Sequence, residues 1–156
     1  MTTRKKNPTL RRLDALVGTW ETSVIVGDQT MTGGRTVFTW QEGEGILQQC
    51  SDADTDGWSP EWVANSPLPT SAAIGLEDRT GRFFMLYSDA RGVCRLYETS
   101  LDGGLWKIWG HSAEDFYQRF EGRISDDGRT ITAYWEKSFD GTTWARDFDM
   151  KYAKVD

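Results

Sequence analysis

Glycine-centred turns recur at nearly even spacing along the second half of this chain, and that spacing restricts the fold more than any other feature. Three of the turns lie eleven residues apart, the next interval is 25 residues, about two periods, and the last is 13. Asp-Gly and similar pairs between runs of alternating polarity are strong signals of β-hairpins. The turns are Thr80-Gly81, Arg91-Gly92, Asp102-Gly103, Asp127-Gly128 and Asp140-Gly141.

Between these turns and before them, runs of alternating polarity predict about ten β-strands. Connections this short cannot hold the crossover that joins parallel strands, so we expect an antiparallel, up-and-down meander and an all-β fold. The expected strands are Thr19–Val26, Arg35–Glu42, Ile46–Asp52, Ser71–Glu77, Arg82–Ser88, Val93–Ser100, Leu105–Gly110, Phe116–Ile124, Thr130–Ser138 and Trp144–Ala153.

Ten meandering strands have two sensible arrangements, a closed barrel or a sandwich of two sheets. Closure removes both exposed sheet edges, and we expect the barrel. A barrel of more than eight strands encloses more space than side chains alone fill. The barrel therefore predicts an internal binding site or internal water.

A short helix is expected to precede the first strand and to cover one end of the barrel. Asn7 is a good N-cap and Pro8 suits the first helical position. Apolar residues recur at three- and four-residue steps from Leu10 to Val17, and Gly18 is expected to end the helix.

Length and charge limit the partners of the chain. Its 156 residues predict one domain spanning 1–156, with residues 1–6 as a flexible tail. A net charge of −6 argues against nucleic acid or an anionic membrane as a partner. No apolar run is long enough to span a membrane, and residues 1–8 lack the apolar core of a signal peptide. We expect a cytoplasmic monomer or homodimer.

The connection over residues 53–70 breaks the rhythm and contains Trp58 and Trp62. A long loop in a compact domain is typically a lid or binding loop, or else disordered. One helical turn would place these two side chains on one face. We expect them to form a lid over one mouth of the barrel; packing against the outer wall is the alternative.

A helix that leads into Gly18-Thr19-Trp20 resembles the opening of lipocalin-like barrels of the calycin type. The resemblance implies that Trp20 plugs the base of the barrel. Most of residues 10–155 also resembles a group of uncharacterised bacterial lipocalin-like proteins, through residues 35–40, 87–93, 97–103 and 120–131.

Two better-understood families are more distant resemblances. Fatty-acid-binding proteins hold a carboxylate with buried Arg and Tyr in a ten-stranded barrel, and nitrobindins hold haem through a His. The Gly-x-Gly and Tyr-Pro continuation of nitrobindins is absent after Trp20. The resemblances imply a fold more firmly than an activity.

Few residues suit metal or acid–base chemistry. His111 is the only histidine, which excludes a multi-histidine metal site. We expect no metal and no cofactor. Haem bound through His111 is the less favoured alternative. An isomerase or cyclase that uses a tyrosine, Glu136 or His111 as acid or base is the alternative function, and no catalytic residue is assigned. Cys50 and Cys94 are expected to be free thiols.

Polar residues within the strands are the most informative candidates for an internal site. A four-residue turn over residues 89–92 pairs Ser88 with Val93 and leaves open which face is inside. If Arg95 and Tyr97 face inward they form an anion-recognising pair; the alternative places Arg95 outside.

In the last strand, either turn length places Arg146 on the face of Phe148, Met150 and Tyr152, which we take as the inner face. We expect a small-molecule binder whose ligand is apolar or aromatic and carries a carboxylate or phenolate. The expected ligand-binding residues are Trp40, Arg95, Tyr97, Trp109, Gln118, Phe120, Tyr134 and Arg146.

Overall fold

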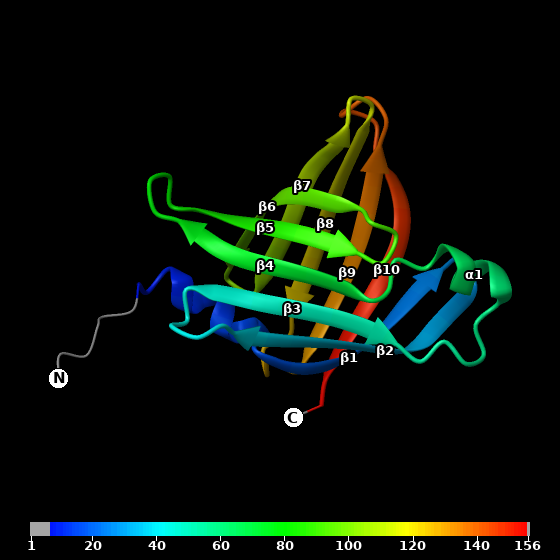
Figure 1. Ribbon diagram of the computed structural model, residues 1–156, viewed down its shortest axis with the longest axis horizontal. Coiled ribbons are helices and arrows are strands. Elements are labelled where there is room, and N and C mark those ends of the chain that lie inside the picture. The colour runs from blue at the N-terminus through cyan, green and yellow to red at the C-terminus, as the bar shows by residue number, and fades with distance from the viewer. Residues whose placement is uncertain (1–6, 156) are drawn as a thin grey trace.

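The chain forms a closed antiparallel barrel in which every strand pairs with its neighbours in sequence and β1 pairs with β10 (Figure 1). The structure is a computed structural model and describes residues 7–155, with all their side chains except those of Ser112 and Ala113. The strands are β1 (Gly18–Val26), β2 (Gln29–Trp40), β3 (Ile46–Ala53), β4 (Thr70–Glu77), β5 (Arg82–Asp89), β6 (Cys94–Asp102), β7 (Leu105–Ala113), β8 (Phe116–Ile124), β9 (Thr130–Ser138) and β10 (Ala145–Lys154). The expected all-β barrel is confirmed.

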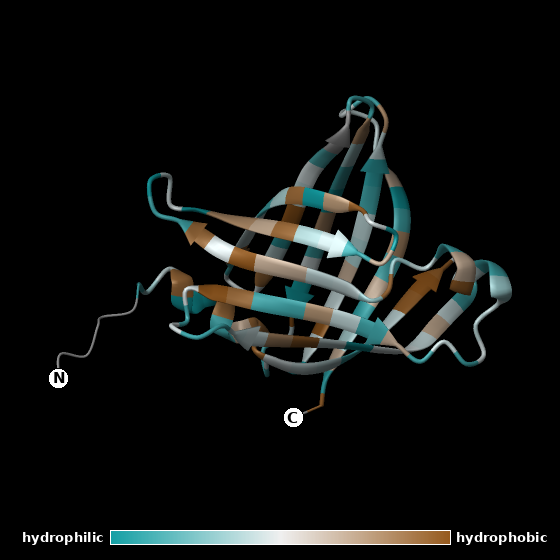
Figure 2. Ribbon diagram, viewed as in Figure 1, coloured by the Kyte–Doolittle hydropathy of each residue, from teal (hydrophilic) through white to brown (hydrophobic). Residues whose placement is uncertain are grey.

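The strands follow the alternation of the sequence, as the change between hydrophobic and hydrophilic residues along each ribbon shows (Figure 2). The main departure is β2, which begins at Gln29 rather than at Arg35. Gly33 and Gly34 lie within this strand. They stand opposite the point at which the pairing with β1 shifts register, between Thr22 and Val24. A Cβ on Gly34 would lie 2.2 Å from the Thr22 hydroxyl oxygen, so only glycine fits this close approach.

A short 3-10 helix, η1 (Leu10–Leu16), closes the base of the barrel. The Asn7 side chain accepts a hydrogen bond from the Thr9 amide at 2.9 Å before the helix begins. Leu13 and Leu16 are buried, and the Trp20 indole donates to the Leu16 carbonyl at 2.8 Å. These contacts seal the end of the barrel at which β1 begins.

The barrel interior is divided into two parts. Near η1 it is filled by buried side chains, which we call the lower interior: Trp20, Phe38, Ile74, Trp106, Phe120 and Tyr152 are its largest members, all at most 3% exposed. Toward the other end the inner-wall side chains are partly exposed. We call this group the upper interior, formed by Tyr87, Arg95, Phe116, Gln118, Trp135 and Lys137.

The observed register of the β5–β6 hairpin differs from the expected one by one residue. Ser88 pairs with Cys94 and Tyr87 with Arg95, because the loop contains five residues instead of four. A slip of one residue moves every side chain of a strand to the opposite face. Phe83, Met85 and Tyr87 therefore share the inner face with Arg95 and Tyr97 rather than with Cys94 and Leu96.

No helix among the described residues is both long and apolar enough to cross a membrane. The expected tail at residues 1–6 lies outside the described residues.

Candidate functional site

Arg95, Tyr97 and Gln118 meet in the interior of the barrel, near its open end. The Gln118 amide oxygen accepts two hydrogen bonds, one from Arg95 Nη1 at 3.0 Å and one from the Tyr97 hydroxyl at 2.7 Å. Arg95 and Tyr97 come from β6 and Gln118 from β8, so the cluster bridges β7. These are three of the residues proposed from the sequence, and the structure brings them together.

Gly110 on β7 makes this bridge sterically feasible. It pairs with Gln118, and a Cβ built on it would lie 2.5 Å from Cδ1 of the Tyr97 ring. The Tyr97 ring therefore lies directly on the backbone of β7, and its hydroxyl reaches the next strand. Gly110 is not among the residues predicted from the sequence, although glycine inside a strand is a known signal of close approach by another group.

Among the described residues, the charge of Arg95 is not balanced by an acid. Within residues 7–155, no carboxylate lies at ion-pair distance from its guanidinium, and only Nη1 takes part in a hydrogen bond. The Phe116 ring lies 5.9 Å from Cζ of Arg95. A guanidinium has five N–H donors, so Arg95 retains donors for a ligand.

Beside this cluster, the β5–β6 loop forms part of the rim of the barrel's open end. Asp89, whose side chain is fully buried, holds this loop in place. Its carboxylate accepts from the Tyr87 hydroxyl at 2.9 Å, from Arg91 Nη2 at 2.7 Å and from the backbone amides of Arg91 and Val93. Burial acts to raise the pKa of Asp89, but these hydrogen bonds outweigh it and lower the pKa to about 2. Asp89 is therefore ionised near neutral pH and fixes the hairpin beside Arg95.

Burial, together with the Asp89 hydrogen bond, raises the pKa of Tyr87 far above its ordinary value. The Tyr87 ring lies 6.2 Å from that of Tyr97. Tyr87 is thus a neutral hydroxyl of the upper interior. Sequence analysis did not select Tyr87 or Asp89, because an Asp at the start of a hairpin loop is usually a turn residue.

Two other predicted ligand-binding residues lie inside the barrel but below the cluster. Phe120 is 2% exposed and packs in the lower interior, 4.8 Å from the Trp106 ring. Trp40 lies at the base, where its indole donates to Asp14 at 2.8 Å and Arg11 covers its ring at 4.3 Å. Trp40 thus lies at the opposite end of the barrel from Arg95.

The expectation that Trp109, Tyr134 and Arg146 line the interior is wrong: all three lie on the outer wall. A register shift in β10 between Arg146 and Phe148 places these two side chains on opposite faces of the strand. Arg146 pairs with Glu136 on the outer face, while Phe148 lies on the inner face. Arg146 contacts Asp149 and covers the Tyr134 ring, whose hydroxyl bonds Glu121. Trp109 pairs with Glu98 and Arg119 and is 39% exposed.

His111 and Glu136, the residues considered for acid–base chemistry, also lie on the outer wall. The His111 ring is exposed and stacks on Tyr117 at 4.2 Å. Because Gly110 faces the interior, the next residue of the strand faces outward. His111 therefore does not fit as the ligand of a haem iron inside the barrel. Glu136 is paired with Arg119 at 2.8 Å.

The two cysteines are free and exposed on the outer wall. Cys50 pairs with Ser71, Ser71 with Ser88, and Ser88 with Cys94. Two strands thus separate the thiols, which places them beyond disulfide distance. Among the described residues, no group of three His, Cys, Asp or Glu side chains could hold a metal ion.

The segment predicted as a lid lies at the open end and contains helix α1 (Pro60–Asn65), beside the β1–β2 hairpin (Figure 1). The Ser59 side chain caps α1 by accepting from the Trp62 amide, at 3.4 Å. The Trp58 indole donates to the Thr32 carbonyl of β2 at 3.1 Å. This bond attaches the loop to the barrel wall, and the lid role stays a prediction.

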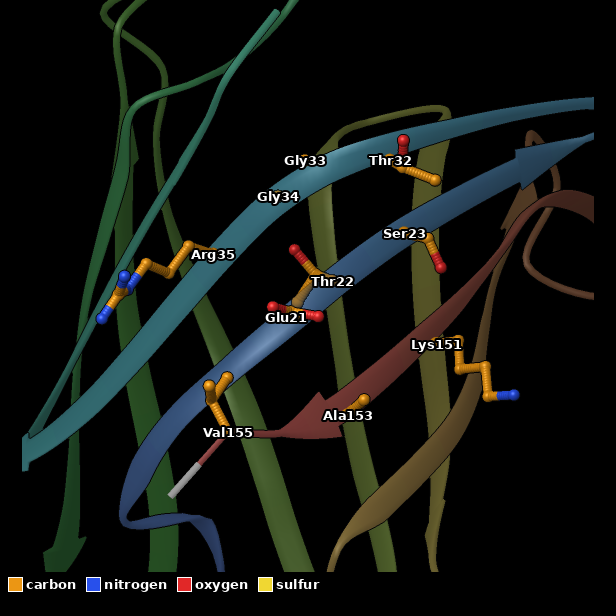
Figure 3. Close-up of a pocket in the computed structure, with 10 residues that line it drawn as sticks. All are labelled: Glu21, Thr22, Ser23, Thr32, Gly33, Gly34, Arg35, Lys151, Ala153 and Val155. Carbon is orange, nitrogen blue, oxygen red and sulfur yellow. The ribbon is translucent and has the colours of Figure 1, made fainter.

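Two pockets lie on the outer wall. One, of about 510 Å³, lies over β1, β2 and β10, where Thr22 pairs with Gly34 and Glu21 with Arg35 (Figure 3). Figure 3 shows that its two cationic side chains, Arg35 and Lys151, extend in opposite directions. The other, of about 540 Å³, lies beside Cys50 and Ser88. The two cations of the pocket in Figure 3 therefore do not converge on one point, whereas Arg95 and Gln118 inside the barrel are joined by a hydrogen bond.

Fold and site together define a ten-stranded antiparallel barrel with an interior polar cluster near its open end. The fold is similar to the crystal structure of Rv2717c from M. tuberculosis, with a TM-score of 0.59, 15% sequence identity, and coverage of 97% of this chain and 100% of that chain. Identity this low shows a shared fold alone. No family model matches the chain, and no curated protein matches it.

Proposed function

We propose that this protein binds a small apolar or aromatic molecule that carries a carboxylate or phenolate, in the upper interior of the barrel. A closed barrel of this size is compatible with binding a small ligand. The observation that carries the proposal is Arg95, a partly buried cation on the inner wall that has no acidic partner within residues 7–155.

Removing a charged group from water is costly unless an opposite charge or several hydrogen bonds compensate it. Within the part of the chain that the structure describes, Arg95 has one hydrogen bond, to a neutral amide. An anion placed beside Arg95 would supply the missing charge and accept from the remaining guanidinium N–H groups, an arrangement suited to a planar carboxylate. Phe116 and Trp135 offer aromatic surface to the rest of such a ligand.

The proposal needs only the small ligand as partner. Neither nucleic acid nor a membrane takes part, in line with the net charge of −6. We propose, as an extension, that the protein acts in the cytoplasm as a monomer or homodimer.

The test is a calorimetric titration of the protein with benzoate, comparing the natural chain with Arg95→Gln and Arg146→Gln. A hydrogen bond to a charged group contributes about 1.5–3 kcal/mol, so Arg95→Gln should weaken benzoate binding by roughly 10–100-fold. Arg146→Gln is the matched control, because Arg146 lies on the outer wall with Asp149. Equal affinities in all three proteins, or no binding to the natural chain at millimolar benzoate, contradict the proposal.

Native mass spectrometry of the protein as purified is the complementary measurement. A mass that is present in the native spectrum and lost on denaturation would identify the ligand directly. An anionic aromatic or apolar compound supports the proposal, and a cationic one contradicts it.

A further inference from the structure

The indole of Trp106 spans the lumen of the barrel and sets the depth of the interior. Trp106 lies on β7 and its ring is 5.9 Å from that of Phe38 on β2. In the closed ring of strands, β7 and β2 are five strands apart in either direction and thus face each other across the barrel. The same indole contacts Tyr152 of β10 at 6.1 Å. Trp106 therefore blocks the axis of the barrel.

The strands on either side of β7 also position this indole. Gly122 of β8 pairs directly with Trp106, and a Cβ built on it would lie 3.1 Å from the side chains of both Ile131 and Phe120. The indole donates to the Thr99 hydroxyl at 3.1 Å, and that hydroxyl donates to the Lys107 carbonyl at 2.7 Å. The orientation of Trp106 is thus fixed by hydrogen bonds as well as by packing.

A second aromatic layer lies on top of Trp106. The Phe120 ring is 4.8 Å from Trp106 and 5.2 Å from Trp135. The Tyr97 ring is 6.0 Å from Trp135. Since Tyr97 and Phe120 are at most 3% exposed, this layer forms a closed floor beneath Arg95 and Gln118.

The anion-binding groups lie close to the rim, only one layer above this floor. Arg95 is the second residue of β6, and Tyr97 is the next inward-facing residue. Inward-facing residues of one strand are about 7 Å apart along the strand, twice the rise per residue. A ligand anchored at Arg95 would therefore reach the floor after about 7 Å, comparable with the length of a single aromatic ring and its carboxylate.

We infer that the site selects compact anions of about one ring in length, such as aryl carboxylates and phenolates, and discriminates against long-chain fatty acids. This inference rests on the proposed function and specifies its ligand class. A long chain anchored at Arg95 meets the floor of Tyr97, Phe120 and Trp135 below it. Above the rim, its methylenes would remain in water and contribute little binding energy.

The experiment compares benzoate, decanoate and palmitate as calorimetric ligands of the natural chain and of two phenylalanine variants. The natural chain should bind benzoate at least tenfold more tightly than decanoate or palmitate. Phe120→Leu lowers the floor and should improve decanoate binding about tenfold. Phe84→Leu is the matched control, because Phe84 lies on the outer wall beside Arg82 and should leave all three affinities unchanged.

The outcomes separate the two proposals. If the natural chain binds palmitate or decanoate as tightly as benzoate, the depth limit is wrong while the proposed anion site stands. If it binds none of the three, the proposed function fails, and this inference fails with it. The chain-length series on the natural protein decides the question even if Phe120→Leu does not fold.

Discussion

The Tyr97 hydroxyl donates to the Gln118 amide oxygen at 2.7 Å by crossing an intervening strand on which Gly110 leaves room for its ring. This bond, with the one that Arg95 donates to the same oxygen, holds three side chains in one geometry at the open end of the barrel. A preorganised polar group of this kind loses less freedom when a ligand binds.

Substituting Gly110 by alanine should destabilise the protein and disrupt the cluster. The new Cβ would lie 2.5 Å from the Tyr97 ring, so the ring must move away from Gln118. Overpacking of this kind costs about 1–3 kcal/mol. Urea unfolding followed by circular dichroism measures the loss.

Gly45→Ala is the control for this prediction, because a Cβ at Gly45 meets no atom within 4 Å. The destabilisation by Gly110→Ala should also shrink when Tyr97 is replaced by valine, which removes the ring. An unchanged cost in the Tyr97→Val background would show that the Tyr97 ring is not the cause.

The two tryptophans of β7 should differ sharply in their contribution to stability. Trp106 is 1% exposed and fills the lumen, whereas Trp109 is 39% exposed on the outer wall. Trp106→Ala should lower the free energy of unfolding by about 3–5 kcal/mol, because it leaves a cavity. Trp109→Ala should cost less than about 1 kcal/mol. Similar losses in chemical denaturation would contradict the assignment of inner and outer faces.

Asp89 should make the stability depend on pH in the acid range. Its pKa is lowered to about 2 in the folded protein, so its contribution is complete above the ordinary carboxyl pKa and is lost as the pH falls toward 2. Asp89→Asn should therefore cost on the order of 1–2 kcal/mol at pH 7. The difference from the natural chain should narrow between pH 4 and pH 2, in urea unfolding at each pH.

Asp78→Asn, in the β4–β5 turn, provides the comparison for Asp89→Asn. Within residues 7–155 its carboxylate has no hydrogen bond or ion pair, and its replacement should change the stability by less than about 0.5 kcal/mol. A difference between the natural chain and Asp89→Asn that stays constant from pH 7 to pH 2 would argue against an ionised, hydrogen-bonded Asp89.

The loop over residues 53–70 should become more mobile when Trp58 loses its donor. Trp58→Phe keeps an aromatic ring but removes the bond to the Thr32 carbonyl, whose net contribution is about 1 kcal/mol. Hydrogen exchange of the amides of this loop should accelerate. Trp62→Phe is the control, because no hydrogen bond from the Trp62 indole is seen within residues 7–155. Equal protection in both variants would contradict an anchoring role for Trp58.

The sequence by itself determined the number and order of the strands. Hairpin turns such as Asp102-Gly103 depend on residues close together in the chain, and their signals are therefore visible in the sequence. The expected bounds of Phe116–Ile124 and Thr130–Ser138 are those of β8 and β9. The pairing of each strand with the next, and closure into a barrel, follow from short connections and the cost of free sheet edges.

Which face of each strand points inward was decided only by the tertiary structure. The extra residue in the β5–β6 loop changed which side chains of the two strands share a face, and the bulge in β10 placed Arg146 on the outer wall. Since side chains alternate along a strand, one inserted residue exchanges inside for outside. The contact of Tyr97 with Gln118 across Gly110 joins three consecutive strands, and it depends on the register that pairs Gly110 with Gln118.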